Sequence, residues 1–179
     1  MEEKNRLELL VEENQKIQIL KTNQYAAKYG LSLSEEQVQM IVKERKKTLK
    51  EQKRVEFGES ILPKIIYTFC DSAYIFQDNY AETLIRLQEI FFLYKNEMQD
   101  EISDDELLTF MKEQFETVCF GDLDYLEGTC LEIFAQAVRG GYRGYRTTEG
   151  RDEYRRFDEI PRWDKEMYLE VFNRLCKGE

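Results

Sequence analysis

The sequence of 179 residues contains no histidine. Imidazole is the usual general base beside a nucleophilic serine or cysteine, and it is a frequent zinc ligand. Its absence excludes Ser-His and Cys-His catalytic pairs, histidine-ligated zinc and the Glu-x-x-His di-iron bundle. An enzyme with this sequence would have to work through carboxylates, lysine, tyrosine or cysteine.

Turn-forming residues are also scarce, since the chain has two prolines and nine glycines. All-β proteins need many such residues at their turns, whereas long helices joined by short connections need few. The composition, with 42% hydrophobic residues, is too apolar for a disordered chain. We therefore expect an all-α fold.

We likewise expect no leader sequence, no membrane span and no basic surface. The chain begins Met-Glu-Glu-Lys without a following apolar run, and no stretch approaches about 18 apolar residues. The formal net charge of −10 offers phosphate groups no general basic footprint. We expect a cytoplasmic protein without a membrane partner, and nucleic acid is not its expected partner.

Metal and cofactor motifs are not found either. The cysteines form no Cys-x-x-Cys pair, and we interpret all four as buried apolar residues: Cys70, Cys119, Cys130 and Cys176. Carboxylates at 35–36 and 104–106 fall in the first turns of predicted helices, where they stabilise the helix dipole and lack the spacing of a calcium loop. We expect no metal and no cofactor.

Cap signals place the expected helices along the chain. Three pairs have the spacing of a capping box: Ser34 with Gln37, Asn79 with Glu82, and Ser103 with Glu106. They predict helices over 34–53, over 80–98, and from 104 to a stop at Gly121. Further helices are expected from residue 61, with Pro63 in the first turn, and over 123–139.

The helix expected over residues 80–98 is the most apolar. More than half of its circumference is hydrophobic, which is typical of a central helix packed on several sides. We expect a compact orthogonal or irregular bundle of about five to seven helices over residues 1–140, in which residues 1–30 have apolar side chains on no single face. Residues 141–160 predict a polar Arg- and Tyr-rich linker, and residues 161–177 a C-terminal docking helix.

Five short segments carry a resemblance to a known family: Val55 to Gly58, Ile61 to Lys64, Phe69 to Ser72, Asn79 to Leu84, and Ser103 to Glu106. Through them the chain resembles a small bacterial protein family of unknown function over about residues 31–139. The resemblance implies a stand-alone helical protein, and it brings no activity and no site residues.

Four polar residues interrupt the apolar arcs of the expected helices: Arg45, Gln88, Lys95 and Glu127. A buried charge is costly unless it is paired. We expect Glu127 to pair with Lys95 or Arg45, with Gln88 hydrogen-bonded to that pair. Such a pair would fix the helix register, or the two cations would send their charges to solvent. The sharper alternative is a polar pocket for an anionic or amide-bearing small molecule.

Two surface segments are further candidates. Lys64 and Asp71 share a polar helix face that could line a shallow site or form one spacing-favoured ion pair. Tyr142, Arg143 and Arg146 interleave aromatic and basic groups, as in segments that stack on single-stranded RNA, but acidic residues follow closely. The plainer interpretation is a polar linker whose acidic residues balance its basic ones, or a strip that binds a protein partner.

The function that fits these observations is that of a non-catalytic helical interaction or accessory module. It would act by surface contact with a protein partner or with itself. The alternative is a small-molecule-binding protein or histidine-free enzyme that uses Lys95 and Glu127. A local RNA contact through Arg143 and Arg146 is the third hypothesis.

Overall fold

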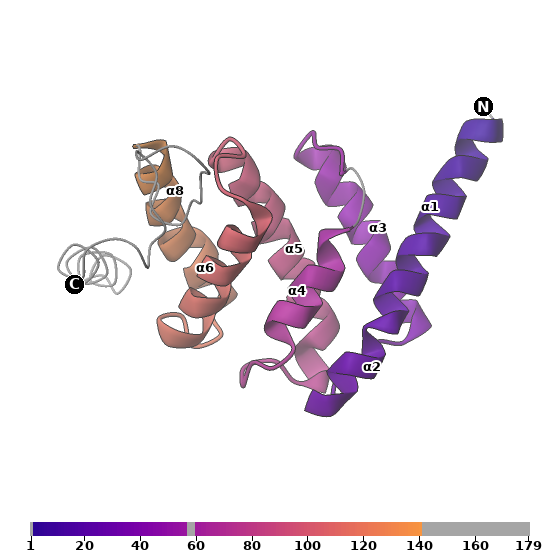
Figure 1. The fold of residues 1–179 in the computed structure, drawn as a ribbon, viewed down its shortest axis with the longest axis horizontal. Coiled ribbons are helices and arrows are strands. Elements are labelled where there is room, and N and C mark those ends of the chain that lie inside the picture. The colour runs from indigo at the N-terminus through magenta and orange to yellow at the C-terminus, as the bar shows by residue number, and fades with distance from the viewer. Residues whose placement is uncertain (1, 57–59, 141–179) are drawn as a thin grey trace, which may run out of the picture. The chain divides into compact units, whose positions relative to one another are not determined.

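The structure is a computed structural model, and it describes residues 2–56 and 60–140 (Figure 1). Every regular element in these two ranges is helical, which confirms the expected all-α fold. None of the described helices is both long and apolar enough to cross a membrane. The expected linker at 141–160 and docking helix at 161–177 lie outside the described residues, as do Tyr142, Arg143 and Arg146.

The chain divides into two compact units, Met1–Phe92 and Leu93–Glu179, with the boundary inside one helix. The first unit contains α1 (Glu2–Lys21), α2 (Asn23–Ala26), the 3-10 turn η1 (Ala27–Tyr29), α3 (Glu35–Glu51), α4 (Ile61–Phe69), the 3-10 turn η2 (Gln77–Asn79) and the start of α5 (Tyr80–Glu97). The second contains the end of α5, α6 (Asp104–Thr117), α7 (Leu123–Tyr125), the π-helical segment η3 (Leu126–Leu131) and α8 (Glu132–Arg139). The single bundle expected over 1–140 stays a prediction.

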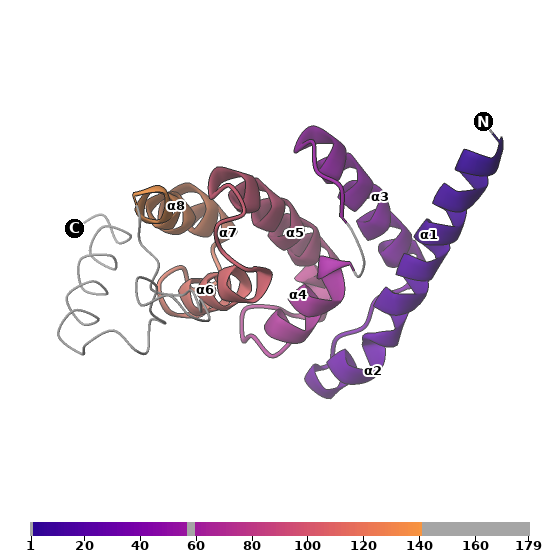
Figure 2. The ribbon, with the colours of Figure 1, turned by 45° about the horizontal axis from the view of Figure 1, so that its top comes forward.

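Helices α1 and α3 lie side by side in opposite directions within the first unit (Figures 1 and 2). The side chain of Asn23 fixes the return of the chain, because it donates to the carbonyl of Leu33 at 2.9 Å and accepts from the Leu33 N–H at 2.8 Å. Gly30 adopts a φ of 73°, which suits glycine at this turn. The Ser34–Gln37 capping box then starts α3, as predicted.

The start of α5 differs from its prediction. The Asn79 side chain accepts from the Phe76 N–H at 2.9 Å and donates to the Tyr74 carbonyl at 3.1 Å. It therefore closes the loop before α5, and the predicted capping box with Glu82 is wrong. A 3-10 turn precedes α5 directly, and in it the Asn79 N–H donates to the Phe76 carbonyl at 3.1 Å.

The second unit begins α6 with the predicted Ser103–Glu106 capping box. Gly121, at a φ of 84°, follows the end of α6, and its N–H bonds the Phe115 carbonyl at 2.9 Å. The rings of Phe110 and Phe134 stack at 3.8 Å between centroids, which joins α6 to α8. Aromatic stacking and burial therefore hold this unit together.

The helix expected over 123–139 is not a regular α-helix. Residues 126–131 form a π-helical segment between α7 and α8, and Glu127 lies within it. The hydroxyl of Tyr94 donates to the carbonyl of Glu127. A π segment has wider turns than an α-helix, so it rotates Glu127 relative to the α8 residues. Glu127 is consequently half-buried and does not lie at the centre of the apolar face.

Candidate interaction surface

Helix α1 carries an apolar stripe on its solvent side. Besides Leu9, four aliphatic side chains of α1 are at least half exposed: Leu7 65%, Leu10 61%, Val11 55% and Ile17 50%. At about 100° per residue they fall within an arc of about 120°, centred about 140° away from Ile19. Ile19 is 1% exposed and marks the face that α1 turns to its own unit. The stripe therefore points away from the core.

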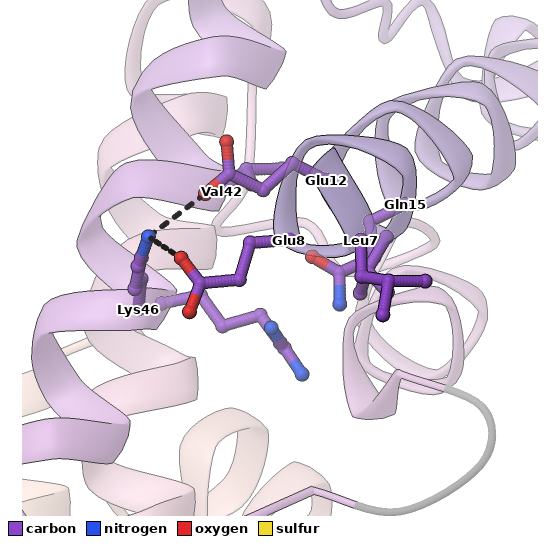
Figure 3. Close-up of a pocket in the computed structure, with 8 residues that line it drawn as sticks. Leu7, Glu8, Glu12, Gln15, Val42 and Lys46 are labelled. Carbon is purple, nitrogen blue, oxygen red and sulfur yellow. Dashed lines mark hydrogen bonds and ion pairs between the residues drawn. The ribbon is translucent and has the colours of Figure 1, made fainter. Parts of the chain in front are cut away.

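The polar side of α1 faces α3. The ammonium of Lys46 on α3 lies 3.1 Å from a carboxylate oxygen of Glu12 and 3.8 Å from one of Glu8 (Figure 3). The hydrogen bond to Glu12, together with the nearby charge of Glu8, raises the pKa of Lys46 above its ordinary value. These contacts are exposed and individually weak. They nevertheless fix which side of α1 is turned outward.

A shallow hollow lies on each flank of α1. The first has a volume of about 350 Å³, and Leu7, Val11 and Val42 form its apolar part, beside Lys46 and its partners Glu8 and Glu12 (Figure 3). The second, of about 360 Å³, lies farther along α1 and includes Ile17 and Val38. Residues of the stripe line both hollows.

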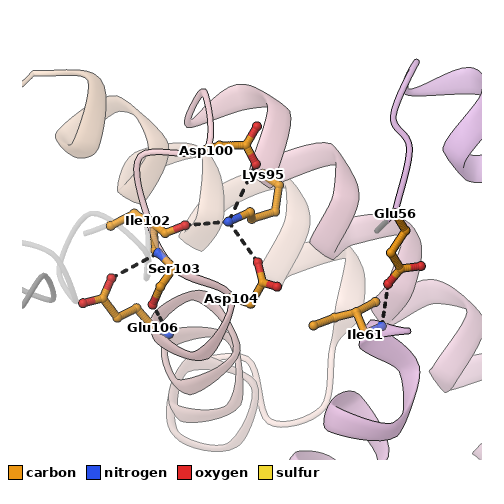
Figure 4. A network of polar contacts seen from close by, with 8 residues as sticks. All are labelled: Glu56, Ile61, Lys95, Asp100, Ile102, Ser103, Asp104 and Glu106. Atoms are coloured by element: carbon orange, nitrogen blue, oxygen red, sulfur yellow. Dashed lines mark hydrogen bonds and ion pairs between the residues drawn. The ribbon is translucent and has the colours of Figure 1, made fainter. Parts of the chain in front are cut away.

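Arg45 is engaged within the first unit. Its Nε donates to a carboxylate oxygen of Glu56 at 2.7 Å, and its Nη2 contacts the same oxygen. The other oxygen of Glu56 accepts from the Ile61 N–H at 2.5 Å, at the first residue of α4 (Figure 4). Both charged side chains are almost buried. Arg45 is thus part of a structural clamp between α3 and α4, and its charge has a partner within its own unit, whereas its expected pairing with Glu127 stays a prediction.

Lys95 is engaged within the second unit. Its ammonium donates to the Ile102 carbonyl at 2.6 Å and lies 3.0 Å from Asp104 and 3.7 Å from Asp100 (Figure 4). The side chain therefore ties the end of α5 to the start of α6. The expected pair of Lys95 with Glu127 is wrong, because α6 and its preceding loop supply all the partners of the ammonium.

The other candidate residues are dispersed. Gln88 is fully buried on α5, and neither of its amide atoms has a hydrogen-bond partner among the described residues, so its expected bond to a charged pair is wrong. Lys64 and Asp71 are exposed, and each takes part in an interaction. Their role in a shallow site stays a prediction.

Cysteines and carboxylates form no evident chemical centre in the described ranges. Cys70, Cys119 and Cys130 are buried, as expected, and the sulfurs of the last two lie 3.6 Å apart. Among residues 2–56 and 60–140, no group of three or more Cys, Asp and Glu side chains is arranged to hold a metal ion.

The family model named "Family of unknown function (DUF6323)" matches residues 18–144. The chain belongs to this family. The match contains the range of 31–139 over which the sequence predicted a family resemblance. No curated protein and no solved structure matches the chain. Within this DUF6323 member, Arg45, Gln88, Lys95 and Glu127 lie in the matched region, whereas the stripe of α1 precedes it.

The α1 stripe was missed by sequence reasoning. Leu9, Ile19 and Leu20 lie on other sides of α1, so the apolar residues of the whole segment share no face. A wheel confined to residues 7–17 does separate the stripe, with Leu9 the exception. No pattern in the sequence predicts the partners of Arg45 and Lys95. Glu56 and Asp100 lie in connecting segments, and the paths of these segments depend on the tertiary fold.

Proposed function

We propose that this DUF6323 member is a non-catalytic helical interaction module that binds a protein chain through the α1 stripe. The observation that carries the proposal is the orientation of α1. Its charged side contacts α3, while Leu7, Leu10 and Val11 point to solvent. Contiguous exposed apolar residues rimmed by charge are typical of protein-binding surfaces.

Burial of the stripe would provide a substantial driving force for association. Fully covering one leucine or valine side chain stabilises a complex by about 1.5–3 kcal/mol before the entropy of association is subtracted. Leu7, Leu10 and Val11 follow the spacing by which an amphipathic helix presents anchors to a groove. We therefore expect the partner to contribute a helix or a groove with an apolar centre.

The remaining parts of the proposal concern the compartment and the chemistry. We place the module in the cytoplasm, since scattered cysteines without a paired pattern suit a reducing compartment. The alternative of a ligand pocket at Lys95 and Glu127 gains no support from the contacts of Lys95. Three oxygens of its own unit surround that ammonium.

Leu9 and Leu10 provide a matched pair for the test. They are neighbours of the same type with exposures of 58% and 61%, yet Leu9 lies about 140° from the centre of the stripe. A photo-crosslinking amino acid would be placed at position 9 or 10 in the full chain, in cells. We expect one defined adduct from position 10 and little from position 9.

A second experiment uses the same two positions. The full-length Leu10→Gln and Leu9→Gln variants would be compared for recovery of the protein crosslinked from position 10, with helix content checked by circular dichroism. We expect Leu10→Gln to lose this protein and Leu9→Gln to retain it. Equal recovery with both folded variants would contradict the proposal.

A further inference from the structure

We infer that the partner of the α1 stripe is the α1 stripe of a second copy, in an antiparallel dimer with twofold symmetry. This inference rests on the proposed function and names its partner. It follows from the spacing of the stripe, the charges on one flank and the way in which α1 is held.

The stripe has the spacing of a short coiled-coil seam. Leu7, Leu10, Asn14 and Ile17 are separated by three, four and three residues. A helix with this 3-4-3 pattern packs its apolar side chains between those of a second helix of the same kind. The seam is thus suited to pairing with another copy of itself.

The flank beside Leu10 carries one charge of each sign. Arg6 and Glu13 lie seven residues apart on that flank, close to the same angle around α1. Both are exposed, and Arg6 has no ion-pair partner within the part of the chain that the structure describes. Glu13 contacts only Lys16 there, at 3.1 Å. Both charges are therefore exposed to solvent on that flank of α1.

The order of these charges selects an antiparallel pair. When two identical helices run in opposite directions, each flank faces the same flank of the other copy. Arg6 of each copy then faces Glu13 of the other, which makes two equivalent opposite-charge pairs. A parallel pair would set Arg6 against Val11 and Glu13 against Gln18. Flanking charges of this kind determine helix orientation in coiled coils.

The antiparallel arrangement also places the apolar residues correctly. With the twofold axis between residues 8 and 9, Leu10 of one copy lies level with Leu7 of the other, and Arg6 lies within about two residues, or about 3 Å along the axis, of Glu13 of the other copy. The overlap extends from about residue 2 to about residue 15, which is about 21 Å of helix. The surface is self-complementary, as a twofold interface requires.

Association needs no rearrangement of the first unit. The contacts of Lys46 with Glu8 and Glu12 hold the opposite side of α1. The side chains of Leu7 and Leu10 and the charges of Arg6 and Glu13 are therefore exposed before a second copy arrives. In a twofold pair, Arg6 of each copy meets Glu13 of the other. Binding of an unrelated protein gives no reason for these two opposite charges to lie on the same flank. For this reason the flank favours a second copy over another protein.

Sedimentation velocity of the full-length protein over a concentration series tests the inference. We expect a monomer–dimer equilibrium for the parent chain and for Leu9→Gln, and a monomer for Leu10→Gln. Circular dichroism of each variant confirms that the exposed substitution leaves the helices intact.

Charge reversal tests the orientation. Arg6→Glu and Glu13→Arg each create two like-charge pairs in an antiparallel dimer, and we expect each to raise the dissociation constant at least about fivefold. The double variant restores both opposite-charge pairs, so we expect it to return to within about twofold of the parent.

The outcomes separate this inference from the proposed function. A chain that stays monomeric at every concentration overturns the dimer, and the proposed function stands if Leu10→Gln still loses a different crosslinked protein. A dimer lost in Leu10→Gln but unchanged by either charge reversal overturns the antiparallel arrangement. If Leu9→Gln and Leu10→Gln behave alike in both sedimentation and crosslinking, both proposals fail.

Discussion

Tyr80 and Tyr94 are both buried on α5, but their hydroxyl groups have different surroundings. The Tyr94 hydroxyl donates to the Glu127 carbonyl in the π segment. The Tyr80 hydroxyl has no hydrogen-bond partner among the described residues. A buried polar group without a partner costs free energy, whereas a satisfied one contributes modestly to stability. The two residues thus allow a direct comparison within one helix.

We predict opposite effects for the two phenylalanine substitutions. Tyr94→Phe removes the hydrogen bond from the Tyr94 hydroxyl to the Glu127 carbonyl, so we expect the free energy of unfolding to fall by about 1 kcal/mol. Tyr80→Phe removes an unpartnered hydroxyl, so we expect it to leave the free energy unchanged or to raise it. Urea denaturation followed by circular dichroism measures both. A larger loss for Tyr80→Phe than for Tyr94→Phe would contradict these hydroxyl assignments.

The same two residues predict sensitivity to alkaline pH. Burial raises the pKa of Tyr80, with Cys70 as a smaller cause, and burial followed by the carboxylates of Glu132, Glu127 and Glu97 raises the pKa of Tyr94. An unfolded tyrosine ionises at about pH 10. In the folded protein both tyrosines have a higher pKa, so above about pH 10 the unfolded chain loses their protons more readily than the folded chain does. The free energy of unfolding is therefore unaffected by these two groups below about pH 10 and falls as the pH rises further.

Spectrophotometric titration checks this pH dependence. Tyrosinate absorbance and helix content would be followed together for the parent chain, Tyr80→Phe and Tyr94→Phe. We expect the ionisation of these two tyrosines to coincide with the loss of helix, and each phenylalanine variant to lack part of that absorbance step. Full ionisation near pH 10 with the helices intact would rule out the raised pKa values.

At the scale of elements, the connection between α3 and α4 depends on Glu56. Its carboxylate accepts from Arg45 and from the first N–H of α4, so one side chain joins the two helices. Because this ion pair is almost buried, removal of one charge leaves the other in a poorly solvated place. Exposed pairs such as Lys46 with Glu12 are screened by water.

We predict that Glu56→Gln lowers the free energy of unfolding by about 3 kcal/mol, because the Arg45 charge loses its partner. The amide oxygen of glutamine can still accept from Ile61, so the start of α4 keeps an acceptor. Lys46→Gln is the control and should have a much smaller effect. Chemical denaturation of both variants measures the difference, and equal effects would contradict a buried clamp.

The elements also differ in how far their sequences predict them. The capping boxes at Ser34 and Ser103 are confirmed because both partners lie within one helical turn. The π segment was not predicted, since its Glu127 carbonyl accepts from Tyr94, 33 residues earlier in the chain. Asn79 had the correct spacing for a cap, yet its side chain found acceptable backbone partners in the preceding loop. Local signals therefore predicted an element correctly only where no other group, near or distant in the sequence, competed for the same hydrogen bonds.

At the scale of the molecule, composition alone predicted the fold class, whereas the candidate interaction surface required the structure. The apolar residues of α1 were visible in the sequence, but a surface residue and a core residue look alike there. The fold distinguishes them, because α3 takes the side of α1 that carries Glu8 and Glu12. Arg45 and Lys95 were candidates for lining a polar pocket, but each binds a group that joins two helices of its own unit: Arg45 binds Glu56, and Lys95 binds the Ile102 carbonyl.

We predict that, within the first unit, the N-terminal half of α1 is the part whose amides exchange hydrogen more slowly as the protein concentration rises. Isolated helical segments of this length are marginally stable in water. Here the tertiary contacts of residues 2–14 include the exposed ion pairs to Lys46. Dimerisation would stabilise these residues by mass action, since binding to the folded state alone favours it as concentration rises.

Amide hydrogen exchange at low and high protein concentration measures this effect. When the free concentration is about ten times the dissociation constant, we expect exchange in residues 5–14 to slow by about tenfold. Amides of α5 should exchange equally at both concentrations and serve as the internal control. In Arg6→Glu, the dependence should shift to higher concentration, because like charges face one another across the axis. The same protection of α1 at both concentrations would show that its outer stripe is not buried by a second copy.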